Sequence, residues 1–196
     1  MKKLPFLAIL LLMTLIYKAQ DQKNLVGTDD PEYVPFKKKE AEESYINGNQ
    51  LTRKKMYKAA EVAYKKSLQL EPDQPVALLN LGNLYKEVDK PKEAEECYLK
   101  IIKMKPEHSV VYSNMSAIKL NAGDYPSTIK YAKIGLAKAK SDHVRQLCSF
   151  NMSAAYSNID SCQQAKKYFY VVKKFVGSKL EGMYSEYDQY LKKRCP

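Results

Sequence analysis

Residues 78–106 read LLNLGNLYKEVDKPKEAEECYLKIIKMKP, and this stretch decides the fold. The residues 34 positions upstream match it where small or aromatic side chains and proline occur. The matching pairs are Gly48 with Gly82, Ala60 with Ala94, Tyr64 with Tyr98, and Pro72 with Pro106. A period of this length indicates stacked structural units, each of which buries its apolar face against its neighbours.

The stretch resembles the tetratricopeptide repeat pattern W-x2-L-G-x2-Y…A-x3-F…P, with Leu78 in the tryptophan position. The small residues Gly82 and Ala94 allow two antiparallel helices to approach closely. Pro106 ends the second helix, because its ring removes a donor and clashes with the preceding turn. The resemblance implies an all-α fold, a right-handed superhelical solenoid of antiparallel helix pairs.

Two further copies follow along the chain. One contains Asn114-Met115-Ser116 and turns at Gly123-Asp124-Tyr125. The other contains Asn151-Met152-Ser153 and comes 37 residues later, so about three residues are inserted near 141–145. We therefore expect an array over 38–179, with repeats at about 41–74, 75–108, 109–142 and 146–179.

The segments outside the array differ from it in composition. Lys2 and Lys3 precede an apolar run of about 14 residues, which is shorter than the ~20 needed to span a bilayer. Residues 1–19 are therefore interpreted as a signal peptide, and residues 20–37 as a flexible linker. We expect export to the periplasm or medium, with an uncleaved membrane anchor as the alternative. Residues 180–196 are expected to form a helix that caps the array.

The chain is basic, with a formal net charge of +11. Three of the 33 basic residues lie in the expected signal peptide, so the mature chain keeps 30 basic and 22 acidic residues. An exported protein is a poor candidate for binding nucleic acid, and no base-reading motif occurs. Two interpretations remain open: solvated outer helix faces, or peripheral contact with an anionic membrane surface, glycan or acidic partner.

Four cysteines in an exported chain raise the question of disulfides. In an antiparallel helix pair, facing residues have a roughly constant sum of residue numbers. Positions 177 and 180 flank the expected last turn, and their sum equals that of Cys162 and Cys195. We predict a Cys162–Cys195 bridge, with two unpaired thiols as the alternative. Cys97 and Cys148 are expected to be buried and free.

In proteins with this repeat, the first helices line a concave groove that receives an extended peptide or a partner helix. Carried over, the resemblance predicts a groove for a protein or peptide partner. Its candidate residues are Tyr45, Asn49, Leu79, Asn80, Asn83, Asn114, Phe150, Asn151 and Asn158. Asparagine can donate to and accept from a peptide backbone, although it is also a common residue at these positions.

Nothing in the sequence predicts an enzyme. His108 and His143 lack neighbours at metal-ligand spacing, and both are expected at the surface in turns between helices. No phosphate-binding glycine loop or nucleophile elbow is present. We therefore expect no catalytic residue, metal or cofactor, and a non-catalytic interaction scaffold. The alternative is a protein that binds an anionic envelope component through its basic surface.

Overall fold

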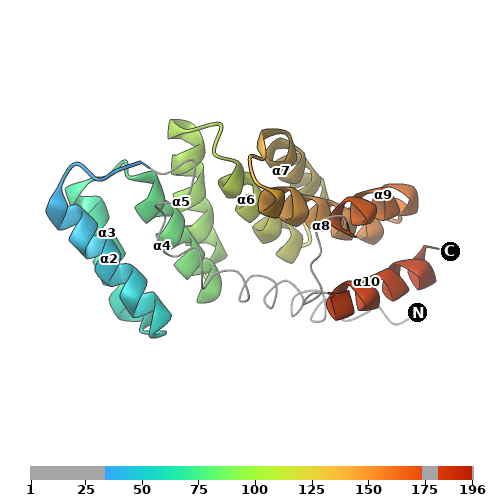
Figure 1. Ribbon diagram of the computed structural model, residues 1–196, viewed down its shortest axis with the longest axis horizontal. Coiled ribbons are helices and arrows are strands. Elements are labelled where there is room, and N and C mark those ends of the chain that lie inside the picture. The colour runs from blue at the N-terminus through green and yellow to red at the C-terminus, as the bar shows by residue number, and fades with distance from the viewer. Residues whose placement is uncertain (1–33, 174–180, 196) are drawn as a thin grey trace. The chain divides into compact units, whose positions relative to one another are not determined.

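The computed structural model describes residues 34–173 and 181–195, and all regular secondary structure in these ranges is helical (Figure 1). The all-α prediction is therefore confirmed. The chain divides into two compact units, with the boundary between Val111 and Tyr112. The expected signal peptide, most of the expected linker and residues 174–180 lie outside the described residues.

The first unit contains two helix pairs. Helix α2 (Lys39–Arg53) packs on α3 (Tyr57–Leu70), and α4 (Pro75–Glu87) packs on α5 (Pro91–Met104). Pro75 and Pro91 begin their helices, where proline's missing N–H is not needed and its fixed φ suits the first turn. Helix α3 also packs on α4, which joins the two pairs.

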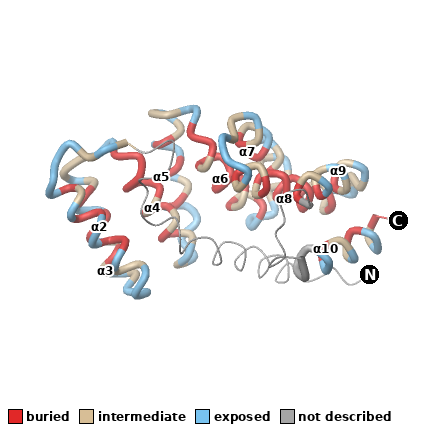
Figure 2. The backbone as a smooth tube through the Cα atoms, in the orientation of Figure 1, coloured by how far each residue is buried: buried red, intermediate tan, exposed pale blue. Residues whose placement is uncertain are grey.

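The second unit contains the later helices. They are α6 (Ser109–Asn121, whose first residues precede the boundary), α7 (Tyr125–Lys138), α8 (Asp142–Asn158), α9 (Cys162–Lys173) and α10 (Glu181–Arg194). Helix α8 packs on both α7 and α9, and α9 packs on α10. Figure 2 shows that buried residues form stripes along these helices. Such stripes are typical of helices that each bury one face.

The turn inside each helix pair contains one residue in the left-handed region. These residues are Lys55, Asp89, Gly123 and Asp160, with φ of 58°, 57°, 75° and 57°. They are separated by 34, 34 and 37 residues, the same steps as in the sequence pattern. Only glycine adopts this conformation without a steric cost, so Lys55 is the least suited of the four.

The inserted residues of the last repeat lengthen α8. This helix has 17 residues, whereas α4 and α6 have 13 each. The extra turn lies at its start, where the Ser141 side chain caps the helix by accepting from Val144 N at 3.4 Å. Arg145 supports the turn by pairing with Asp142 at 2.8 Å and donating to Ala139 O at 2.9 Å.

In the first unit, each glycine of the pattern lies against a tyrosine ring. A Cβ added to Gly48 would lie 2.6 Å from Tyr64 Cδ1, and one added to Gly82 would lie 2.5 Å from Tyr98 Cε1. Both rings are fully buried. No side chain fits between these helices and the rings, which gives the pattern's glycine its physical reason.

A disulfide joins Cys162 at the start of α9 to Cys195 after α10, with their Cα atoms 5.2 Å apart. The sum of residue numbers in the antiparallel pair predicts a bridge between the same two cysteines. Arg194 strengthens the same junction, because it donates to Ser157 O at 2.9 Å and pairs with Asp160 at 2.7 Å. Cys97 and Cys148 are buried free thiols.

Candidate partner-binding site

The structure brings Tyr45, Asn49 and Asn80 together in one hydrogen-bond network. Asn80 Nδ2 donates to Asn49 Oδ1 at 2.9 Å and to Tyr45 Oη at 3.1 Å. Tyr64 Oη donates to the same Asn49 oxygen at 2.7 Å. Tyr45 and Asn49 are each only 5% exposed. The network therefore ties α2 to α3 and α4, and it uses polar groups that the sequence interpretation assigned to a partner.

The same tyrosine–asparagine hydrogen bond recurs one repeat later. Tyr98 Oη donates to Asn83 Oδ1 at 2.7 Å, as Tyr64 does to Asn49. In each pair the tyrosine follows the asparagine by 15 residues. This recurring spacing could have predicted the hydrogen bond from the sequence. Asn80 and Asn83 are half-buried, whereas Leu79 is buried. Their amides are therefore partly accessible on α4.

The second unit uses its predicted groove residues for packing. Phe150 is 1% exposed, and its ring centroid lies 5.1 Å from that of Tyr187 on α10. In this structure Phe150 is a core residue, which corrects the expectation that it offers an apolar surface to a partner. Helix α10 supplies this neighbouring aromatic ring.

Asn114 and Asn151 are also buried, at 3% and 1% exposure. Asn151 Nδ2 donates to Ser116 Oγ at 2.7 Å, which ties α8 to α6. Its Oδ1 has no hydrogen-bond partner among the described residues. Asn158 differs, because it is half-buried and its Nδ2 donates to Ala154 O at 2.8 Å in its own helix. Of the nine candidates, Asn80, Asn83 and Asn158 keep the most accessible surface.

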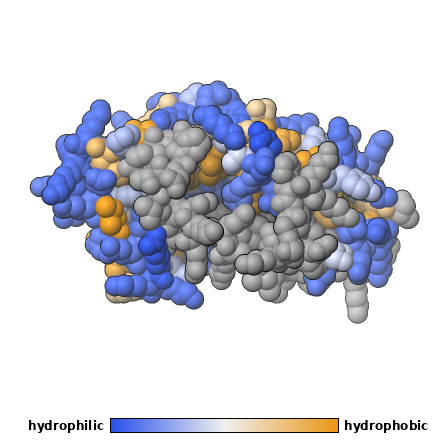
Figure 3. All heavy atoms as spheres, viewed as in Figure 1, coloured by the Kyte–Doolittle hydropathy of each residue, from blue (hydrophilic) through white to orange (hydrophobic). Residues whose placement is uncertain are grey.

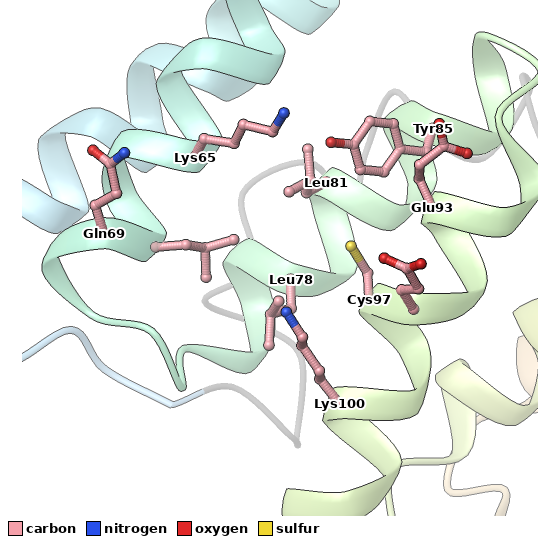
Figure 4. A pocket seen from close by; sticks show the side chains of 10 residues that line it. Lys65, Gln69, Leu78, Leu81, Tyr85, Glu93, Cys97 and Lys100 are labelled. Carbon is pink, nitrogen blue, oxygen red and sulfur yellow. The ribbon is translucent and has the colours of Figure 1, made fainter.

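A pocket of about 330 Å³ lies in the first unit between α3, α4 and α5 (Figure 4). Apolar side chains and one thiol form part of its wall, and charged side chains of both signs complete it. The lining residues are Lys65, Leu68, Gln69, Leu78, Leu81, Tyr85, Glu93, Glu96, Cys97 and Lys100. Burial raises the pKa of the Cys97 thiol to about 11, so it is protonated at neutral pH and is a poor nucleophile.

One side of this region is held by an ionic network around Glu61. Its carboxylate accepts from Lys65 Nζ at 2.7 Å, Tyr85 Oη at 3.0 Å and Lys90 Nζ at 3.4 Å. The hydrogen bond from Lys65 is the main cause that lowers the pKa of Glu61, and Tyr85 adds to it. The network joins α3 to α4 and to the turn before α5.

His108 lies between α5 and α6 as expected, but it is only 3% exposed, so the expectation of a surface residue was wrong for it. His143 is half-buried in the first turn of α8 and not in the segment before it, because α8 begins at Asp142. Burial lowers the pKa of His143. Within the described ranges, no group of three His, Cys, Asp or Glu side chains could hold a metal ion.

None of the helices in the described part of the chain has the length and apolarity to cross a membrane. The expected signal peptide lies outside that part.

Comparison with known proteins identifies the repeat. Residues 51–118 match the family model described as "Tetratricopeptide repeat". A crystal structure of MamA aligns over 79% of this chain and 89% of that chain, with 19% identity and a TM-score of 0.63. MamA from Desulfovibrio magneticus RS-1 aligns over 80% and 86%, with 15% identity and a TM-score of 0.70.

PilF of Pseudomonas aeruginosa is 18% identical, with a TM-score of 0.62 over 68% of this chain and 60% of that chain. At these identities the solved structures show the fold alone. The family match and the fold agree with the repeated sequence pattern. The chain therefore contains tetratricopeptide repeat sequence, which the family model matches at residues 51–118.

Proposed function

We propose that this chain is a non-catalytic scaffold that binds a protein or peptide on the first helices of its repeats. The family and fold support an interaction role, since tetratricopeptide repeat proteins are generally scaffolds for protein partners. The observation that carries the proposal is the partial exposure of the Asn80 and Asn83 amides on α4, beside a network that fixes them. Fixed amides can bind an extended backbone at low entropic cost.

Burial and hydrogen bonds divide the predicted residues into two groups for this proposal. Tyr45, Asn49, Phe150 and Asn151 contact neighbouring helices, and Asn114 is buried. Substitution of these residues would therefore test folding as much as binding. Asn80, Asn83 and Asn158 are the positions for partner contact. Leu79 also lies on α4, but it is only 7% exposed and contributes to packing.

We further propose that the mature chain lies in the bacterial envelope, as the basic and apolar residues at its start favour. One similar structure, PilW, is described as a type IV pilus biogenesis factor. Mass spectrometry of the chain from fractionated cells tests this proposal. A protein in the periplasmic or medium fraction that begins near residue 20 would support export. A cytosolic protein that keeps Met1 would contradict it.

Site-specific photo-cross-linking tests the binding face. A photoreactive residue would replace Asn83 or Asn158, with Val62 on α3 and Leu99 on α5 as controls, since both are exposed. We expect a discrete protein adduct from the asparagine positions and none from the controls. Adducts from the controls alone, or from all four positions equally, would contradict a site on the first helices.

A further inference from the structure

The second helices of the last two helix pairs, α7 and α9, carry positive charge only. They are called the outer helices of the second unit below. Helix α7 contains Lys130, Lys133 and Lys138, and α9 contains Lys166, Lys167 and Lys173, while neither contains aspartate or glutamate. The corresponding helices of the first unit mix both signs. In α3, Glu61 pairs with Lys65, and α5 contains three glutamates as well as three lysines. Among α3, α5, α7 and α9, only the two helices of the second unit carry charge of one sign.

The lysines of α7 lie on its solvent face. Thr128, Ala132 and Gly135 are the buried residues of this helix. At 100° per residue, Lys130 and Lys133 lie on the opposite side of the helix, and both are exposed. Neither is paired with a carboxylate within the described residues. The charge on this face is therefore available to a partner.

Helix α9 repeats this arrangement 37 residues later. Lys167 is the counterpart of Lys130, and it is exposed opposite the buried residues Ala165 and Phe169. Tyr170, the counterpart of Lys133, is 65% exposed. Each of the two equivalent lysines also lies near the following tyrosine ring: Lys130 Nζ is 6.0 Å from the centroid of Tyr131, and Lys167 Nζ is 5.8 Å from that of Tyr168. The outer face is therefore a repeated lysine–tyrosine surface. Hydrophilic residues also cover much of the described surface visible in Figure 3.

The choice of cation indicates what this surface binds. Arginine forms bidentate contacts that recognise a particular phosphate or carboxylate, whereas lysine acts as a point charge. Neither α7 nor α9 contains arginine. Lys130 and Lys133, which have no carboxylate partner among the described residues, suit a diffuse array of negative charge. Tyrosine is a residue of membrane interfaces because its ring is apolar and its hydroxyl polar. A bilayer that contains anionic lipid has both properties.

We propose that the solvent faces of α7 and α9 form a peripheral binding surface for anionic lipid bilayers. The surface is separate from the amides of the first helices, so it does not depend on the proposed partner site. It would hold the scaffold against a membrane while the first helices bind a protein.

Vesicle co-sedimentation of the mature chain tests this proposal. The probes are phosphatidylcholine vesicles with and without about one third phosphatidylglycerol. The variant is Lys130→Glu/Lys133→Glu/Lys167→Glu. The control variant is Lys58→Glu/Lys66→Glu/Lys103→Glu on α3 and α5, which makes the same charge change at exposed lysines. Circular dichroism checks that both variants are folded.

We expect the unmodified chain to bind only the anionic vesicles and to dissociate as salt is raised. The α7/α9 variant should bind about 10- to 100-fold more weakly, and the control should stay within about 3-fold of the unmodified chain. Equal losses in both variants would reduce the effect to net charge and overturn the proposal. Binding to neutral vesicles, or to soluble polyglutamate but not to vesicles, would also overturn it. If the charge-reversal variant does not fold, Lys130→Gln/Lys133→Gln/Lys167→Gln is used, and unchanged binding then contradicts the proposal.

Discussion

The first two repeats and the last two follow the same sequence register but pack their helices differently. In the first two, Tyr64 and Tyr98 lie flat against Gly48 and Gly82, and each hydroxyl bonds an asparagine on the facing helix. In the last two, serine replaces the glycine: Ser116 and Ser153 correspond to Gly82. Ala132 and Phe169 replace the tyrosine. All four repeats keep the same spacing, but the residue at the glycine position and the residue at the tyrosine position change together.

The fourth repeat shows how the missing hydroxyl is replaced. Phe169 cannot donate a hydrogen bond, but Tyr187 of α10 packs on it with ring centroids 5.2 Å apart. The Tyr187 hydroxyl lies 3.2 Å from Ser153 Oγ, which also donates to Ala165 O at 2.8 Å. Burial raises the pKa of Tyr187 to about 12, so the hydroxyl stays neutral at physiological pH. Helix α10 therefore contributes a hydroxyl that the first two repeats supply from their own helix pair.

The comparison predicts that glycine and tyrosine are coupled in the first unit. Tyr98→Ala should cost about 3–5 kcal/mol of unfolding free energy, because it leaves a cavity at a fully buried ring. Gly82→Ser should cost about 1–3 kcal/mol, because its side chain overlaps that ring. The double variant Gly82→Ser/Tyr98→Ala recreates the Ser116–Ala132 pair. Its loss of unfolding free energy should be about 1–3 kcal/mol smaller than the sum of the two single losses.

Urea denaturation of the four proteins measures this coupling. Tyr98→Phe is the control, because it keeps the ring and should leave Gly82→Ser just as costly. Additive losses in the double variant would show that the glycine and the ring are not packed as described.

The second unit should depend on its disulfide instead. Cys162→Ser/Cys195→Ser opens a closed loop and should lower the unfolding free energy by about 3–4 kcal/mol on the chain-entropy model. Alkylation and mass spectrometry without reductant should find two thiols in the native chain, and denaturation should be needed to label them. Burial raises the pKa of Cys97 to about 11 and that of Cys148 to about 12, so both react slowly when folded. Four reactive thiols in the oxidised protein would refute the bridge.

Substitution of the left-handed residue of a turn should change the unfolding free energy in either unit, in a direction set by the residue replaced. Lys55→Gly should raise the unfolding free energy by about 0.5–1 kcal/mol, because it removes a side chain from the left-handed region. Gly123→Ala should lower it by about 1 kcal/mol for the opposite reason. Thermal denaturation compares the two variants with the unmodified chain. A destabilised Lys55→Gly variant would contradict the assigned turn.

The smallest expected effect concerns the Glu61 network, which the second unit lacks at its equivalent positions, Ile129 and Lys166. Because the folded pKa of Glu61 lies below its ordinary value of 4.5, its ionisation stabilises the fold above that pH. This contribution is lost as the pH falls through the lower folded pKa. The stability difference between the unmodified chain and Glu61→Gln should therefore shrink below about pH 4.5. A difference that does not change with pH would contradict the network.

The sequence predicted the repeats because small residues are needed where helices and rings approach closely, proline is favoured where a helix ends, and both requirements recur at a fixed step. The tetratricopeptide repeat resemblance and the all-α fold are confirmed on that basis. The inserted residues were found near 141–145, but their addition to the start of α8 depends on the Ser141 cap and on packing.

The candidate site was harder to predict, because burial depends on helices far along the chain. Phe150 is in the core because residues of α9 and α10 pack around it, among them Tyr187, 37 residues later. Asn49 and Asn83 bond tyrosines of their own helix pairs, so an exposed-amide interpretation fails for the first and holds in part for the second. A family pattern fixes which helix a residue lies on, but not what its polar atoms bond.

Hydrogen exchange of the mature chain tests the central claim most directly, which is that a protein partner binds the first helices. The chain would be compared alone and with the partner that the Asn83 cross-link identifies. We predict slower amide exchange in α4 and α8 on binding, with little change in α3 and α5. Protection of α3 and α5 with unchanged exchange in α4 and α8 would contradict the account.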